Sequence, residues 1–121
     1  MSIFENDFIM RQIDDLTSMI GKVFLHRRES EEVSEEELND DETKKYLRKL
    51  QTLINEENYK EAIAVLKEEF KTGNMEYLTV ALSCFDQINA KTETELQNAG
   101  YSRNQLYTEL SFISEQFGIH L

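Results

Sequence analysis

A helical hairpin is marked out in the sequence between about Thr43 and Gly73, and it constrains the fold more than any other feature. Asn58 is typical of a helix N-cap, and Glu61 stands three residues later in the reciprocal position of a capping box. Gly73 follows the second helical run, where glycine commonly ends a helix. Apolar residues recur at helical spacing between these signals, at Tyr59, Ala62, Ile63, Leu66 and Phe70. The pattern predicts paired helices that bury one face.

The rest of the chain is equally helical in its pattern. It contains no proline and only 4 glycines among 121 residues, so little interrupts long helices. No segment alternates apolar and polar residues as a half-buried strand would. A chain of this length suits one domain, which on folding buries roughly two thirds of its unfolded surface. We therefore predict an all-α fold, a small bundle of about five helices built from helical hairpins.

Apolar spacing and capping residues place these helices along the chain. The predicted helices cover residues 4–25, 41–56, 59–72, 75–89 and 102–117, with a short helical turn over 92–100. Asn74, Thr92 and Ser102 are the expected caps of the last three elements. Within one domain, residues 1–26 form an N-terminal amphipathic helix, 27–42 an acidic connector and 43–121 a helical-hairpin domain.

The charge is concentrated in the connector. The net charge is −11, yet residues 29–42 hold nine acidic residues and no basic one, and elsewhere 15 acidic residues face 13 basic ones. We expect this connector to be mobile or a solvated extension of the next helix, because apart from Val33 and Leu38 it has too little apolar content to contribute to a core. The acidity argues against nucleic acid or an anionic membrane as a partner.

A basic cluster contrasts with this acidity. Lys44, Lys45, Arg48 and Lys49 gather along one side of the second predicted helix. One interpretation is structural, because Asp40 with Lys44 and Asp41 with Lys45 form acid-before-base pairs four residues apart. The other is a partner-binding surface that receives an acidic peptide and is partly shielded by the connector.

The N-terminal helix carries a second candidate surface. Ile9, Ile13, Leu16 and Ile20 are spaced like the a and d positions of two heptads. This seam is open to two main interpretations, packing within the bundle or self-association into a homo-oligomer. A membrane-surface helix is a third, which the acidic polar side of the helix disfavours. No run is apolar and long enough to span a bilayer.

Catalytic and metal-binding motifs are not found. The single cysteine, Cys84, lies at the edge of an inward helical face and is expected to be a buried, free thiol. His26 and His120 lie near predicted helix ends without a metal-ligand or catalytic spacing. The acidic block has no glycine and does not match a calcium-binding loop. We therefore expect no enzyme activity and no cofactor, and one cysteine with no signal peptide suggests the cytoplasm.

The hairpin over about residues 43–73 resembles a single tetratricopeptide repeat, a helix-turn-helix unit that binds peptides when stacked. The matching positions are Tyr46, Leu53, Tyr59, Ala62 and Leu66. The 34-residue period does not recur, so the resemblance implies one such unit and not a full solenoid. Separately, the opening residues from Phe4 to Ile13 resemble a family of short bacterial helical proteins of unknown function.

These observations favour a non-enzymatic protein interaction or adaptor module with a protein or peptide partner. A structural homodimer assembled through the N-terminal helix is the first alternative, and a small-ligand carrier or enzyme is the second. The expected partners include neither nucleic acid nor a membrane.

Overall fold

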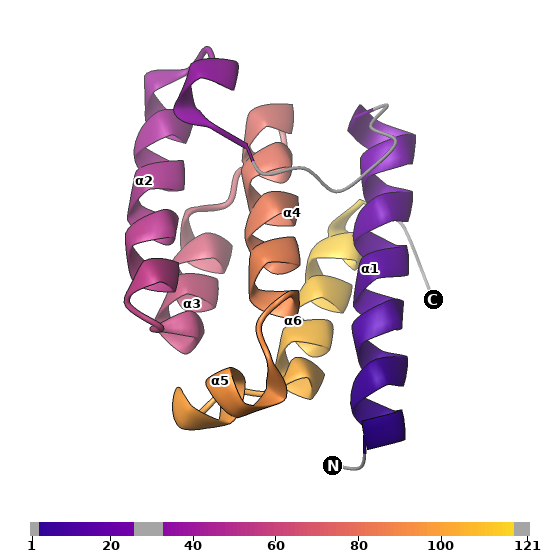
Figure 1. Cartoon of the computed structure of the whole chain (residues 1–121). Helices are drawn as coiled ribbons and strands as arrows, with labels where there is room; N and C mark the ends of the chain where they lie inside the picture. The colour runs from indigo at the N-terminus through magenta and orange to yellow at the C-terminus, as the bar shows by residue number, and fades with distance from the viewer. Residues whose placement is uncertain (1–2, 26–32, 118–121) are drawn as a thin grey trace.

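The computed structural model describes residues 3–25 and 33–117, with side chains from residue 6 onward, and these residues form six α-helices and one 3-10 turn (Figure 1). The elements are α1 (Ile3–Leu25), η1 (Glu35–Glu37), α2 (Asp41–Asn55), α3 (Tyr59–Glu69), α4 (Met75–Asn89), α5 (Glu93–Asn98) and α6 (Arg103–Gln116). No strand occurs in these ranges, and the predicted all-α bundle is confirmed.

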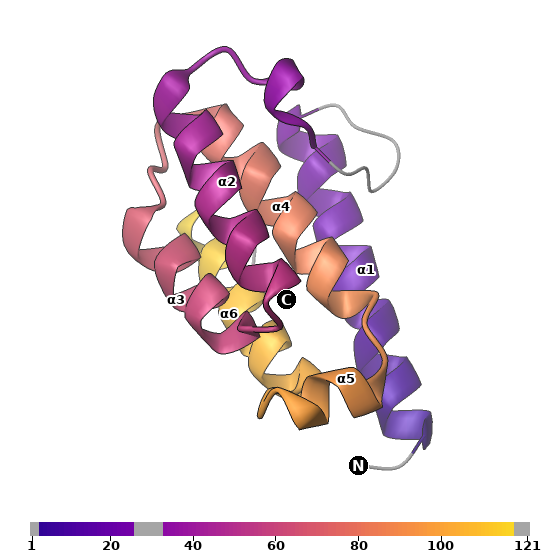
Figure 2. The same cartoon turned by 60° about the vertical axis from the view of Figure 1, so that its left-hand side comes forward.

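The helices form two layers around α4. In Figure 1, α4 lies between α2 and α1, while α3 and α6 lie behind them, and the turned view of Figure 2 agrees. α1 packs on α4 and α6, and α2 packs on α3 and α4. The short helix α5 crosses the end of the bundle where α4 finishes (Figure 1).

The central position of α4 explains its burial. The inward residues predicted from the sequence are almost inaccessible; they are Leu78, Ala81, Leu82, Phe85 and Ile88. Tyr77, Val80 and Cys84 are buried as well, because α4 has neighbours on several sides instead of one. A helix with one solvated face would leave about half of these positions exposed.

Three of the predicted caps are present as expected. The side chain of Asn74 accepts a hydrogen bond from the backbone N–H of Glu76, and Ser102 accepts one from Gln105. Thr92 forms a complete capping box with Glu95. These caps satisfy backbone N–H groups that have no partner within the first helical turn.

The corner of the hairpin is built differently from the prediction. Helix α3 starts after Asn58, but the Asn58 side chain makes no capping hydrogen bond. Instead the backbone N–H of Asn58 donates to the carbonyl of Leu53 at 2.8 Å, and that of Glu57 donates to Ile54 at 3.0 Å. This is a Schellman motif, and it places Glu57 at a φ of 61°, in the left-handed region.

The end of the hairpin also differs. α3 stops at Glu69, three residues before the predicted end, because Phe70 is extended. The Phe70 ring lies 6.0 Å from that of Phe117, so leaving the helix lets this side chain pack against the end of α6. Gly73 then lies in the turn that leads to α4 and does not itself end the helix.

Candidate functional site

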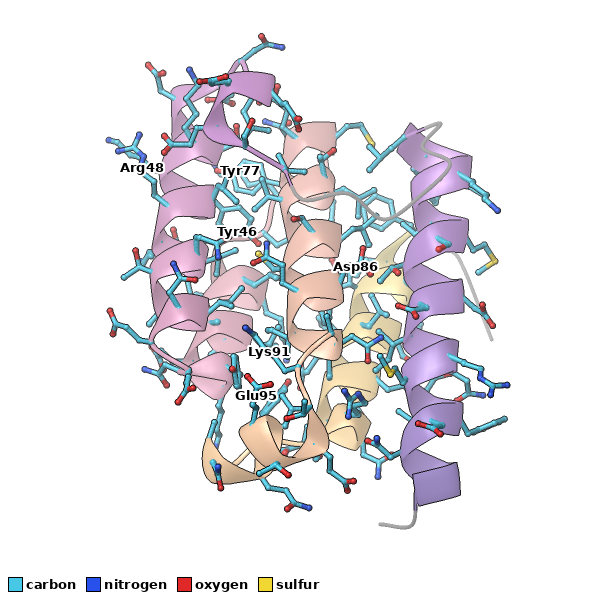
Figure 3. The ribbon with its side chains drawn as sticks, in the orientation of Figure 1. Tyr46, Arg48, Tyr77, Asp86, Lys91 and Glu95 are labelled. Carbon is cyan, nitrogen blue, oxygen red and sulfur yellow. The ribbon has the colours of Figure 1, made fainter. Side chains whose placement is uncertain are left out.

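The basic cluster of α2 lies on two flanks of the helix. Arg48 Nε pairs with Glu35 Oε1 of η1 at 2.7 Å, while Lys49 Nζ pairs with Glu69 Oε2 of α3 at 2.7 Å. Figure 3 shows Arg48 on the outer surface of α2, away from the core between α2 and α4. Lys44 precedes Arg48 and Lys45 precedes Lys49 by four residues, so the four cations form two rows on different flanks and do not line one groove together.

The two ion pairs expected within α2 are replaced by others. Within the described residues, no ion pair joins Asp40 with Lys44 or Asp41 with Lys45. Asp40 instead caps α2, because its carboxylate accepts the backbone N–H of Glu42 at 2.9 Å. The basic residues of α2 that are paired contact acidic residues from η1 and α3.

The acidic connector is partly docked on the bundle. We call residues 33–38 the docked segment; residues 27–32 of the predicted connector lie outside the described residues. Val33 and Leu38 are 8% and 4% exposed, so both aliphatic side chains are buried in the core. The docked segment is therefore not a solvated extension of α2, because residues 38–40 separate η1 from α2 and its two apolar anchors, five residues apart, are buried.

Polar contacts hold the docked segment at its first residue and at the residues that follow it. The backbone N–H of Val33 donates to Ser83 Oγ of α4 at 3.3 Å. The carboxylate of Glu76, seven residues earlier on α4, accepts the backbone N–H groups of Asn39 at 2.9 Å and of Asp40 at 3.0 Å. The start of the segment thus contacts the later residue of α4 and its end contacts the earlier one, so the segment runs antiparallel to α4. Both contacts lie on one face of α4, because seven residues span two helical turns.

Glu76 is the most connected polar group of this region. Besides the two backbone N–H groups, its carboxylate accepts the Thr43 hydroxyl at 2.7 Å. These hydrogen bonds, led by the one from Asn39, lower the pKa of Glu76 below its ordinary value, because they favour the ionised carboxylate. Glu76 thereby joins the start of α4 to the start of α2.

A cavity adjoins the docked segment. It has a volume of about 300 Å³ and lies between the segment and α2, with Val33, Glu35, Arg48, Gln51 and Asn55 in its wall. The side chains of Glu35 and Arg48 are 45% and 59% exposed, so the ion pair between them contributes little free energy to keeping the cavity covered. The guanidinium of Arg48 therefore remains exposed to solvent at the cavity wall.

The predicted self-association seam lies mostly inside the molecule. Ile13, Leu16 and Ile20 are at most 2% exposed, and Ile9 is partly buried against the same core. They are buried because α1 folds back onto α4 and α6. This seam therefore serves packing within the bundle and is not available at the surface to a second chain.

The described residues include no helix long and apolar enough to cross a membrane.

A second cavity lies between α3 and α6, away from the basic cluster. It has a volume of about 390 Å³, and its wall includes Lys67, Tyr101 and Glu109. Lys67 Nζ pairs with Glu109 Oε2 at 2.5 Å, and the buried Tyr101 hydroxyl has no hydrogen-bond partner among the described residues. Burial raises the pKa of Tyr101, with a further contribution from the negative charge of Glu109.

The remaining candidates for chemistry are few. Cys84 is buried as predicted, and desolvation raises the pKa of its thiol to about 12. In residues 3–25 and 33–117, no group of three or more His, Cys, Asp or Glu side chains could hold a metal ion. His26 and His120 lie outside the described residues.

Sequence patterns missed the residues of α4 that contact the docked segment. Ser83 and Glu76 appear in the sequence as ordinary polar positions on a helix, and Glu76 as a first-turn acid. The one available signal was Val33 and Leu38, two aliphatic residues within an acidic run. Their burial depends on a partner surface that is far away in the sequence.

Comparison with known proteins gives one match. A family model described as "Family of unknown function (DUF6483)" matches residues 3–118, which is nearly the whole chain. No curated protein and no solved structure matches the chain significantly.

Proposed function

The chain belongs to the DUF6483 family of unknown function, and from this premise we propose that it is a non-enzymatic protein interaction module that binds an acidic peptide segment of a partner. The binding surface is the flank of α2 that carries Arg48 and Lys44, together with the adjoining face of α4. The bacterial and cytoplasmic setting suggested by the sequence belongs to the same proposal.

One observation carries this proposal. The chain's own acidic segment already lies on this surface, with Glu35 on Arg48 and with Val33 and Leu38 buried. Exposed ion pairs of this kind contribute only about 0.2–1 kcal/mol, so a partner carboxylate can replace Glu35 at little cost. The tethered segment competes at a high effective concentration, and this sets the affinity that a partner must exceed.

The packing of the hairpin of α2 and α3 supports the same proposal. α2 and α3 form a helical hairpin, and α4 packs beside α2, as the first helix of a following repeat would in a tetratricopeptide array. The Tyr46 hydroxyl donates to the carbonyl of Leu66 at 2.6 Å and ties the two helices together. In such arrays the first helices of successive units present the ligand-binding surface, which here corresponds to α2 and α4.

Charge reversal tests this proposal. Lys44→Glu with Arg48→Glu should abolish capture of an acidic partner and leave the helical circular-dichroism signal intact, because both side chains lie outside the core. Arg11→Glu with Lys22→Glu is the matched control, since it makes the same Arg and Lys charge reversals at exposed positions of α1 that form no ion pair among the described residues. A captured partner that binds the α2 double variant as well as the wild type would disprove the proposed surface.

A structural homodimer is the second candidate, and one specific observation favours it. α1 exposes Phe8, Met19 and Val23 on the flank of the helix next to its buried seam. These residues lie 11 and 4 positions apart and therefore share one face of the helix. Light scattering tests this candidate: a dimer that Phe8→Asp with Val23→Asp converts into a folded monomer would support it, and a wild-type monomer at high concentration would end it.

A further inference from the structure

Resting on the proposed function, we infer that the partner segment carries an aliphatic residue, a carboxylate two positions later and a second aliphatic residue three positions after that. This is the spacing of Val33, Glu35 and Leu38 in the docked segment. The partner is a segment of another protein that replaces residues 33–38 on the same surface.

The apolar anchors set the distance between the two aliphatic residues. Val33 and Leu38 are both buried in the core cluster, whereas Ser34, Glu36 and Glu37 between them are exposed. The chain between the anchors forms the 3-10 turn η1, in which the N–H groups of Glu37 and Leu38 donate to the carbonyls of Ser34 and Glu35 at 3.1 Å. This turn shortens the segment, so moving one anchor by a single residue would direct its side chain toward solvent.

The polar contacts set the direction and the position of the charge. Ser83 Oγ accepts the N–H of the first anchor residue, so a partner must offer a free N–H there. Arg48 takes the carboxylate of the residue two positions later. The carboxylates of Glu36 and Glu37 make no hydrogen bond or ion pair within the described residues, so these two positions tolerate any polar residue.

Replacement leaves the rest of the fold in place. The Glu76 contacts go to Asn39, Asp40 and Thr43, which follow the segment and lie just before or within the first turn of α2. Asp40 also keeps its capping contact with Glu42. A partner can therefore displace residues 33–38 while α2 retains its cap.

A labelled peptide tests this inference directly. The probe is the N-acetylated, C-amidated sequence of residues 33–38 with a fluorophore, and the protein is the full chain with Val33→Ser and Leu38→Ser, which frees the surface. We expect fluorescence anisotropy to show binding that is about tenfold or more tighter than to the wild type, because the wild type retains its own anchors. Circular dichroism confirms that the variant is folded.

The control peptides separate this inference from the proposed function. Exchanging the residues that correspond to Glu37 and Leu38 keeps composition and charge, and should weaken binding about tenfold because one anchor is lost. Equal binding of this exchanged peptide would overturn the spacing but leave acidic docking intact. A Glu35→Lys peptide that binds as tightly as the probe would instead overturn the role of Arg48.

Two further outcomes decide the occupant. If the double variant does not fold, the peptide is titrated into the isotopically labelled wild type, where displacement should shift the backbone amide resonances of Val33 and Leu38. Absence of any shift at millimolar peptide would overturn the inference. A wild type that is dimeric in light scattering and becomes monomeric with Val33→Ser and Leu38→Ser would show that a second copy is the occupant, and would also overturn it.

Discussion

The guanidinium of Arg103 donates hydrogen bonds to both the side chain and the backbone of Asn89. Its Nε donates to Asn89 Oδ1 at 3.2 Å, and its Nη2 donates to the Asn89 carbonyl at 2.9 Å and also to the carbonyl of Lys91. Its Nη1 donates to Asn6 Oδ1 at 2.6 Å. Arg103 is only 3% exposed, and it joins α1 and α6 to the carboxyl end of α4, where a cation is favourable.

Removing this guanidinium should strongly destabilise the fold. Arg103→Ala leaves several buried acceptors without a donor, and we expect it to lower the free energy of unfolding by about 3–5 kcal/mol. Urea denaturation followed by circular dichroism measures the loss. Arg11→Ala, at an exposed position of α1, is the control and should stay within about 0.5 kcal/mol of the wild type. Similar stabilities for both variants would refute the role of Arg103.

Glycine at the hairpin corner should stabilise the protein. Glu57 has a φ of 61°, which is unfavourable for a residue with a Cβ, and its side chain is exposed. We expect Glu57→Gly to raise the free energy of unfolding by about 0.5–1 kcal/mol, because glycine adopts this conformation without steric cost. Glu56→Gly, at a φ of −84°, should instead destabilise by a similar amount. The prediction fails if both variants shift the urea midpoint downward.

Glu76 should make stability depend on pH. Hydrogen bonds lower its folded-state pKa below the ordinary value of 4.5, so its stabilising contribution is fully present above that value. The contribution is lost as pH falls through the folded-state pKa. We expect the melting temperature of Glu76→Gln to lie below that of the wild type at pH 7, and the gap to close on acidification toward pH 3. Glu36→Gln, an exposed change on η1, should show no such gap, and a constant gap for Glu76→Gln would contradict the prediction.

Charges on the buried seam of α1 should unfold the chain. Ile13→Asp with Ile20→Asp places two carboxylates in a core that offers them no partner, which costs several kcal/mol. Circular dichroism should show loss of the cooperative thermal transition. Phe8→Asp with Val23→Asp, on the exposed side of the same helix, should retain it. A folded monomer from the first pair would mean that the seam does not pack in the bundle.

The thiol of Cys84 should be inert in the native protein. The side chain is buried, and its pKa of about 12 leaves little reactive thiolate at neutral pH. We expect a disulfide reagent such as Ellman's to react with it slowly in buffer and rapidly in urea. Rapid modification of the folded protein would show that α4 is accessible around Cys84.

The helices and most of their caps could be predicted from the sequence because these features depend on neighbours within a few residues. Asn74, Thr92 and Ser102 cap the helices at which the sequence placed them, and α4 has the predicted bounds. The corner at Glu57 was less accessible to prediction, since a Schellman motif without glycine leaves no compositional signal.

The candidate site was predicted only in part. The sequence located the basic cluster of α2 and the acidic connector next to it, because both are local runs of charge. It could not show that Arg48 faces η1 and Lys49 faces α3, since that depends on where these two elements pack.

The sequence by itself thus determined that the chain is all-α, where most of its helices lie, which of their faces are apolar and where charge is concentrated. It did so through local backbone preferences and apolar periodicity. The tertiary structure decided which surfaces those faces meet. The seam of α1 could have faced another chain, and Val33 could have been exposed, until packing placed them against α4. The burial of Arg103 likewise depends on Asn6, 97 residues away along the chain. Apolar burial has no preferred direction, so periodicity predicts that a face is buried but not what covers it.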